Sequence, residues 1–261
     1  MPYKQYKRKT RTKTRRKTKG GKLGTLTRIM DYEGSPIIGA GGYGIVLDLG
    51  NGHREAIKLF KHVEDCKAIG LEARIQNRCY ELFLGTEIYV PKLTFYRQSP
   101  IKYRNVPYLC GIGMEYLPPP LDFEEQVHMV LGYEGNDIDS SWGTRMSEPV
   151  SSENPTRGFF ASADTMESIW KQEGSSMNLD KMSYLMGKGF RTIIDAGIIP
   201  IDIEWVWSKG KPWMIDFGLC QEGKVNPEEF LLKGGSEGLG TDIYWPRNKE
   251  FYRGYFNSSG S

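Results

Sequence analysis

The sequence of 261 residues has no apolar run long enough to span a bilayer and no secretory segment at its start, which disfavours a membrane protein. Its three histidines show no metal-ligand spacing with cysteine, which disfavours a zinc site. Its cysteines contain no C-x-x-C pair, a pattern that favours reduced thiols over a disulfide framework. They are Cys66, Cys79, Cys110 and Cys220. We therefore expect an intracellular protein, cytoplasmic or nuclear, with no membrane partner.

Acidic residues are absent from the first 30 positions, which hold twelve of the 35 Lys and Arg residues. The later residues hold all 32 Asp and Glu, and their net charge is −9. Residues 4–22 are of low complexity, and their like charges repel, so we predict a disordered basic arm over residues 1–30. Such an arm is typical of binding to nucleic acid or another polyanion, and also of a solubilising tail.

The most informative stretch runs from Ile37 to Phe60. Glycines let a backbone come close to phosphates, and three of them here have G-x-G-x-x-G spacing: Gly39, Gly41 and Gly44. A dinucleotide-binding turn would open a helix, but residues 45–49 form a largely apolar run that stops near Asn51-Gly52, which predicts a strand and a hairpin. The stretch therefore predicts strand, glycine loop, strand, turn and strand, and its Lys58 could meet phosphates as a point charge.

Periodic apolar residues outline the remaining elements. The predicted helices cover residues 61–83, 123–131, 162–172 and 179–196, and the predicted strands lie near 92–97, 108–114 and 205–207. Asn178 can cap the start of the last helix, and Gly197 stands where a C-terminal glycine belongs. The first helix contains Glu72, which is either a solvated carboxylate or a partner of Lys58.

Three short runs then occur in a fixed order. Ala56-Ile57-Lys58 ends the third strand, Met114-Glu115-Tyr116-Leu117 follows a later strand, and a hydrophobic strand leads into Asp216-Phe217-Gly218. With the glycine loop in front of them, this order resembles that of a protein kinase, in which a Gly-rich loop covers ATP and a lysine on the third strand grips it. The resemblance extends from residue 33 to about residue 247.

The resemblance implies an α+β, bilobal protein-kinase-like fold. Residues 31–117 would form an N-lobe with a five-stranded antiparallel sheet and one helix. Residues 118–261 would form a reduced, mainly helical C-lobe, with a long insertion near 132–178. Residues 240–246 faintly resemble the run that closes an activation segment, and beyond them we expect no further C-lobe helices.

The resemblance also implies ATP and Mg²⁺ as cofactors and assigns roles to individual residues. Lys58, held by Glu72, would bind phosphates with the glycine loop, Asp202 would accept the substrate hydroxyl proton, and Asp216 would bind Mg²⁺. The adenine would lie among Val46, Ala56, Met114 and the hinge residues Glu115 and Leu117.

The sequence departs from the kinase pattern around Asp202. Pro200 and Ile201 replace the His-Arg of the family, and Trp207 stands where a metal-binding asparagine is expected. Glu204 falls just before the next strand. Because a carboxylate can bind Mg²⁺, Glu204 is a candidate replacement for that asparagine, and it is equally a candidate exposed acid.

The predicted function is ATP- and Mg²⁺-dependent phosphoryl transfer to a Ser/Thr hydroxyl of a protein substrate. The alternative is a pseudokinase that binds nucleotide or a partner without transfer, with a polyanion-binding arm at residues 4–22. The short length, the basic arm and the altered loop are also similar to kinase-like proteins of large DNA viruses, which would place the protein in a host cell or virion.

Overall fold

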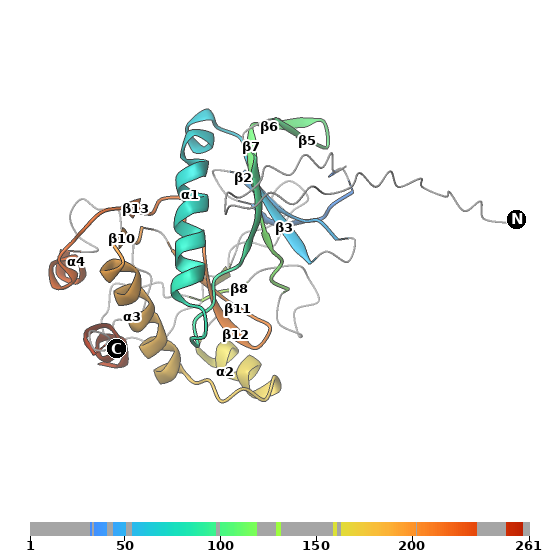
Figure 1. Ribbon diagram of the computed structural model, residues 1–261. Coiled ribbons are helices and arrows are strands. Elements are labelled where there is room, and N and C mark those ends of the chain that lie inside the picture. Colours follow the sequence, from blue (N-terminus) through green and yellow to red (C-terminus); the bar gives the residue numbers. More distant parts are fainter. Residues whose placement is uncertain are drawn as a thin grey trace, which may run out of the picture.

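The computed structural model describes residues 32, 34–40, 44–50, 54–97, 100–118, 129–131, 159–160, 163–201, 203–233 and 249–257. Within these residues the protein is α+β, with five helices and one five-stranded antiparallel sheet (Figure 1). The predicted arm and the predicted Asn51-Gly52 turn lie outside the described residues, as do residues 234–248.

The five-stranded sheet confirms the sheet predicted for the first part of the chain. Its order is β1-β2-β3-β7-β4, and all neighbours are antiparallel. The strands are β1 (Ile37–Ala40), β2 (Gly44–Asp48), β3 (Glu55–Phe60), β4 (Leu93–Arg97) and β7 (Cys110–Glu115).

A second hairpin, β5 (Ile101–Tyr103) and β6 (Val106–Tyr108), precedes β7 and was not predicted. Its two turn residues, Arg104 and Asn105, have positive φ values of 46° and 62°. Positive φ at both central residues is the geometry of a type I′ turn, for which Asn-Gly is the usual signal. Of Arg104 and Asn105 only the asparagine favours a positive φ, so the hairpin was not recognised from the sequence.

Helix α1 (Val63–Leu82) confirms the helix predicted over residues 61–83. It contributes to two hydrophobic clusters. Ile69 and Ala73 pack with Phe60 and Ile112 of the sheet, whereas Ile75 belongs to the larger cluster formed with the second half of the chain. Figure 1 shows α1 between the sheet and the later helices. The helix is therefore the element that both halves of the protein share.

The prediction of four reduced cysteines is wrong for one pair. Cys66 in α1 and Cys110 at the start of β7 form a disulfide, while Cys79 and Cys220 are free and buried. The two bonded cysteines are 44 residues apart in sequence. They meet because the first turns of α1 pack against β7, and no local spacing pattern reports a contact of that kind.

The second half of the chain combines four helices with short strands. The helices are α2 (Ala163–Gln172), α3 (Leu179–Asp195), α4 (Pro227–Lys233) and α5 (Lys249–Phe256). The strands β8 (Met129–Leu131), β9 (Phe159–Phe160), β11 (Glu204–Ser208) and β12 (Lys211–Ile215) form a sheet in the order β12-β11-β8-β9, and β10 (Ile198–Ile199) pairs with β13 (Gln221–Glu222).

Several predictions for this half are confirmed and two are wrong. Helices α2 and α3 stand where they were predicted, Asn178 accepts a hydrogen bond from Lys181 N at 2.8 Å, and Gly197 has φ +74°. The predicted helix over 123–131 is wrong at Met129–Leu131, which is strand β8. Its residues pair with β11, and a three-residue strand with a distant partner has no periodicity to recognise.

The second wrong prediction is that no helix follows residue 247. The structure has helix α5 there. It crosses α3 closely at Gly187 and Gly254. A Cβ on Gly187 would collide with the carbonyl oxygen of Phe251, and a Cβ on Gly254 would collide with that of Tyr184. Phe251 and Tyr255 are fully buried in the cluster around Trp205. An isolated helix of eight residues has little stability in water, so the contact with α3 is what stabilises α5.

None of the helices in the described ranges is both long and apolar enough to cross a membrane.

Candidate functional site

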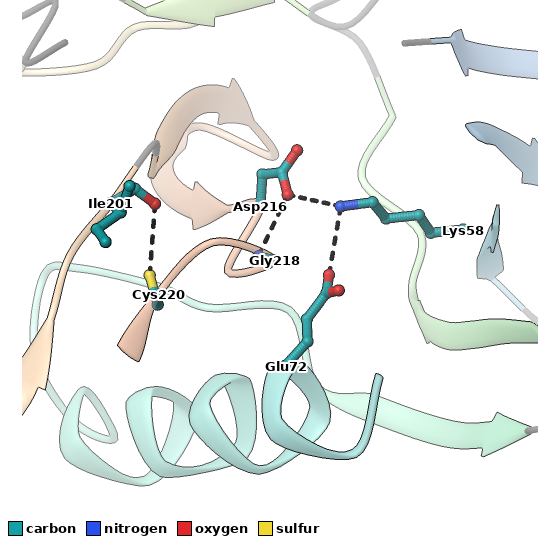
Figure 2. A network of polar contacts seen from close by, with 6 residues as sticks. All are labelled: Lys58, Glu72, Ile201, Asp216, Gly218 and Cys220. Carbon is teal, nitrogen blue, oxygen red and sulfur yellow. Dashed lines mark hydrogen bonds and ion pairs between the residues drawn. The ribbon is translucent and has the colours of Figure 1, made fainter. Parts of the chain in front are cut away.

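Lys58 lies between two carboxylates that come from distant parts of the chain (Figure 2). Its Nζ atom is 2.5 Å from Asp216 Oδ1 and 3.3 Å from Glu72 Oε1. Lys58 is on β3, Glu72 is on α1, and Asp216 directly follows β12. The structure thus brings together three of the residues that the sequence analysis selected, and it contains the predicted contact between Lys58 and Glu72.

Burial and the neighbouring charges act in opposite directions on the pKa of Lys58. The Lys58 and Glu72 side chains are 14% and 5% exposed, and that of Asp216 is 37% exposed. Burial alone lowers the pKa of Lys58, but the charges of Asp216 and Glu72 outweigh it and hold that pKa above its ordinary value. Burial raises the pKa of Glu72, against the opposing effect of Lys58. Lys58 is consequently charged at neutral pH, and Asp216, the most exposed member, is open to a ligand.

The backbone at Asp216 has an unusual conformation. Its φ is +57°, in the left-handed region that residues other than glycine rarely adopt. Gly218 N donates a 3.5 Å hydrogen bond to Asp216 Oδ1, and Phe217 is 1% exposed. The buried ring and the turn together aim the carboxylate at Lys58. Strained backbone of this kind is concentrated at functional sites.

The glycine loop is described only at its two ends, because Gly41 lies outside the described residues. Gly39 is in β1 and Gly44 starts β2, and Val46, one of the expected adenine contacts, is opposite Gly39. A Cβ at Gly44 would collide with the carbonyl oxygen of Leu59 in β3. The close approach of the two strands therefore requires glycine at position 44. This packing requirement is separate from the phosphate role expected from the sequence.

Three of the expected adenine-contact residues, Met114, Glu115 and Leu117, lie at or just after the end of β7. Met114 is directly opposite Ala56 in the sheet register, and Ala56 is buried. The backbone N–H of Glu115 donates to Lys92 O at 2.9 Å, and that of Tyr116 donates to Arg54 O at 2.7 Å. In the described part of the chain, the N–H of Leu117 has no such backbone acceptor.

Strand β11 contains both Trp207, which stands at the position of the expected asparagine, and Glu204, the candidate metal ligand. Trp207 is 1% exposed, and its Nε1 donates a 2.6 Å hydrogen bond to Glu173 Oε2, so it is a core residue. Glu204 is opposite Ile215 in the register, and residues directly opposite share a face of the sheet. By strand alternation, Glu204 lies on the face of Val206 and Ile215, which pack near Leu117.

Two carboxylates, Asp216 and Glu204, were the residues selected from the sequence as candidate Mg²⁺ ligands. Glu204 is half-buried. It pairs with Ile215 in the register of β11 and β12, and Asp216 is the next residue after Ile215. Across the described ranges, no group of three or more His, Cys, Asp or Glu side chains is arranged to hold a metal ion. Mg²⁺ commonly takes one or two carboxylates and completes its shell with phosphate oxygens and water. Asp216 and Glu204 are carboxylates of the kind that such a shell uses.

Asp202, the predicted proton acceptor, lies outside the described residues. Its neighbours Ile201 and Ile203 are 8% and 5% exposed. The thiol of Cys220 donates a 3.6 Å hydrogen bond to Ile201 O, as Figure 2 shows. The backbone next to Asp202 is thus attached to the segment that follows Asp216.

Sequence reasoning missed an ion-pair cluster between α1 and β13. Glu222 binds both Arg74 and Arg78 at 3.2 Å. The only signal was that the two arginines are four residues apart and share a helix face, and nothing local connects them to a glutamate more than 140 residues away.

No protein-family model matches the chain, and no curated protein has a sequence significantly similar to it.

Proposed function

We propose that this protein transfers the γ-phosphoryl group of ATP, with Mg²⁺, to a Ser/Thr hydroxyl of a protein substrate. The observation that carries the proposal is the Lys58–Glu72–Asp216 cluster, in which a buried lysine is held by one carboxylate from a helix and another from the residue after a core strand. The proposal includes a bilobal kinase-like arrangement, with residues 31–117 and 118–261 as its two lobes.

In this proposal each residue has a distinct task. Lys58 binds the phosphates as a fixed positive charge, and Glu72 orients it. Asp216 and Glu204 hold Mg²⁺, which when bound neutralises negative charge on the phosphates. Asp202 accepts the proton of the substrate hydroxyl. The apolar surfaces of Val46 and Ala56 contact the adenine base, with Met114 behind it.

The contact between Lys58 and Asp216 has a consequence for nucleotide binding. At 2.5 Å the two groups neutralise each other, so phosphates compete with Asp216 for Lys58. Binding of Mg²⁺ to Asp216 removes that competition. We therefore infer that ATP binds more tightly with Mg²⁺ than without it.

A second candidate function is binding of a nucleotide or a partner without phosphoryl transfer. It is favoured by Trp207, which is buried in the core where the kinase pattern has a metal-binding asparagine, and by Pro200-Ile201 in place of His-Arg. Phosphoryl transfer and nucleotide binding without transfer need the same cradle, so one experiment must measure binding and transfer separately.

We expect Mg·ATP to raise the melting temperature of the wild-type protein by about 5 °C or more at a ligand concentration roughly 100-fold above the dissociation constant, since such binding contributes about 2.7 kcal/mol. ATP with a chelator should give a smaller rise. Incorporation of ³²P from labelled ATP into a mixture of Ser- and Thr-containing protein substrates measures transfer. A shift without incorporation would favour nucleotide binding without transfer, and the absence of both would rule out transfer and nucleotide binding together.

We further propose that residues 4–22 bind a polyanion. Neutralised phosphates release counterions, so affinity for RNA or DNA should fall steeply with salt. Deleting residues 1–22 is expected to lower RNA affinity at least tenfold at low salt and to flatten the salt dependence. Equal binding by the full chain and the deletion variant, measured by fluorescence anisotropy over a salt series, would contradict this role.

A further inference from the structure

Glu222 is the meeting point of two arginines from one face of α1. Arg74 donates through Nε and Nη2, each at 3.2 Å, and Arg78 donates through Nη1 at 3.2 Å. Hydrogen bonds from Arg74 and the charges of both arginines hold the pKa of Glu222 below its ordinary value. The carboxylate is therefore ionised at neutral pH, and all three side chains form one charged network.

This network joins the two segments that supply the carboxylates of the Lys58 cluster. Arg74 follows Glu72 by two residues on α1, and Glu222 follows Asp216 by six residues. Strand β13, which ends at Glu222, lies beside α1 together with β10 in Figure 1. A contact between Arg74 and Glu222 therefore fixes the Glu72 segment relative to the Asp216 segment.

Arg78 adds a third attachment. Its Nη2 donates a 2.6 Å hydrogen bond to the carbonyl oxygen of Ala196, the C-cap of α3. A helix C-terminus has free carbonyl groups and partial negative charge, which favours a cation there. The chain runs from Ala196 through β10 toward Asp202. Arg78 thus links α1 to the segment that carries the predicted proton acceptor.

The position of α1 has a direct effect on the Lys58 cluster. The Lys58–Glu72 distance is 3.3 Å, near the long end of the hydrogen-bond range, so a small rotation or shift of α1 breaks it. The first turns of α1 are attached to the sheet through Cys66 and Cys110. Arg74 and Arg78, about two and three turns beyond Cys66, attach the helix to Glu222, and Arg78 also to Ala196.

We propose that Glu222 is a positioning residue, which through Arg74 and Arg78 holds α1 where Glu72 reaches Lys58. Its effect on transfer rests on the proposed function, whereas its effect on the geometry of Lys58 does not. The three side chains are 38–57% exposed, and exposed ion pairs contribute little to overall stability. Loss of this network should consequently alter the site more than it alters the melting temperature.

The test compares Glu222→Arg with Glu64→Arg in the full chain. Glu222 has its matched control in Glu64, an exposed carboxylate on α1 that pairs with Lys67 of the same helix at 2.8 Å. The first readout is labelling of Lys58 by an amine-reactive reagent, quantified on its peptide by mass spectrometry. Labelling requires the neutral amine, whose fraction rises tenfold for each unit by which the pKa falls.

In Glu222→Arg we expect Lys58 labelling to rise about threefold or more above wild type, since Glu72 no longer holds the charged amine. The ratio kcat/KM for ATP should fall about tenfold, because misplacement of a binding group is costly. The melting temperatures of the variant and the control should agree within about 2 °C, because single exposed ion pairs add little. The double variant Arg74→Glu/Glu222→Arg restores opposite charges and should recover low labelling.

Labelling of Lys58 in Glu222→Arg that equals both wild type and Glu64→Arg would overturn the positioning role. Labelling that rises but is not reduced by the charge swap would overturn it as well, because the effect would then not come from the ion pair. If the wild-type protein shows no transfer, the proposed function fails, and the labelling result still decides the role of Glu222.

Discussion

Replacing Asp216 with asparagine is expected to lower the rate of phosphoryl transfer about 10³-fold while the protein stays folded. Asparagine has the same size, but it lacks the negative charge that pairs with Lys58 and that we propose to bind Mg²⁺. Removing one preorganised charged or donor group at such a site typically costs 10² to 10³ in rate. Asparagine also tolerates the left-handed backbone at this position, φ +57°, so the change tests chemistry rather than folding.

The matched control is Asp195→Asn, which neutralises an exposed carboxylate that pairs with Arg191 at 2.9 Å on α3, away from Lys58. Initial rates of ³²P incorporation and melting curves would be measured for the two variants and for wild type. Lys58→Met should reduce transfer similarly, because it removes the charge that binds the phosphates. Transfer by Asp216→Asn near the wild-type rate would refute the proposed chemistry.

These assays can be run across about pH 6 to 9 without titrating Lys58. Its folded pKa is raised above 10.5 by Asp216 and Glu72, after their charges have offset the lowering due to burial. A raised lysine pKa means that the stabilisation from these contacts is fully present below the unfolded pKa and is lost only as pH rises through the folded pKa. A change in rate within that interval would therefore report another group.

The second large effect is expected at the crossing of α3 and α5. Gly187→Ala and Gly254→Ala should each lower the free energy of unfolding by about 2–4 kcal/mol. In each case the new methyl group would collide with a backbone carbonyl of the other helix, Phe251 O or Tyr184 O. Backbone cannot rotate away as a side chain does, so the helices must separate, and overpacking of this kind outweighs the gain of about 1 kcal/mol in helix propensity.

Gly70→Ala provides the control for this prediction. Gly70 is also a helical glycine, in α1, but nothing lies within 4 Å of the position that its Cβ would take. The same substitution should therefore stabilise the protein by roughly 0.5–1 kcal/mol. Urea unfolding curves of the three variants give the comparison. Equal effects at Gly70 and Gly187 would show that the two helices do not cross as the structure describes.

The local part of the fold was predictable because its signals are short-range. Helices α1 and α3 have apolar residues at helical spacing over 17 to 20 residues, and the apolar strands around Asn51-Gly52 alternate with turn residues. The predicted pairing of Lys58 with Glu72 also succeeded, but it came from a resemblance of motif order. No periodicity measures the distance between two residues on different elements.

The missed features all depend on contacts between distant segments. The Cys66–Cys110 disulfide, helix α5 and the strand at Met129–Leu131 have weak local signals, and each is stabilised by a partner far away in sequence. Burial of Trp207 likewise follows from the packing of β11 against the helices. A residue's neighbours in space determine these outcomes, and a single sequence states only its neighbours along the chain.

The sequence by itself determined the separation of charge between the first 30 residues and the rest, the long helices, the strands of the glycine-containing unit, and the set of candidate site residues. Only the tertiary structure decided which of these residues meet. It placed Asp216 and Glu72 on either side of Lys58, put Trp207 in the core, and joined Arg74 and Arg78 to Glu222. The physical reason is that charge and periodicity are properties of the chain, whereas ion pairs and burial require that separate elements fold against one another.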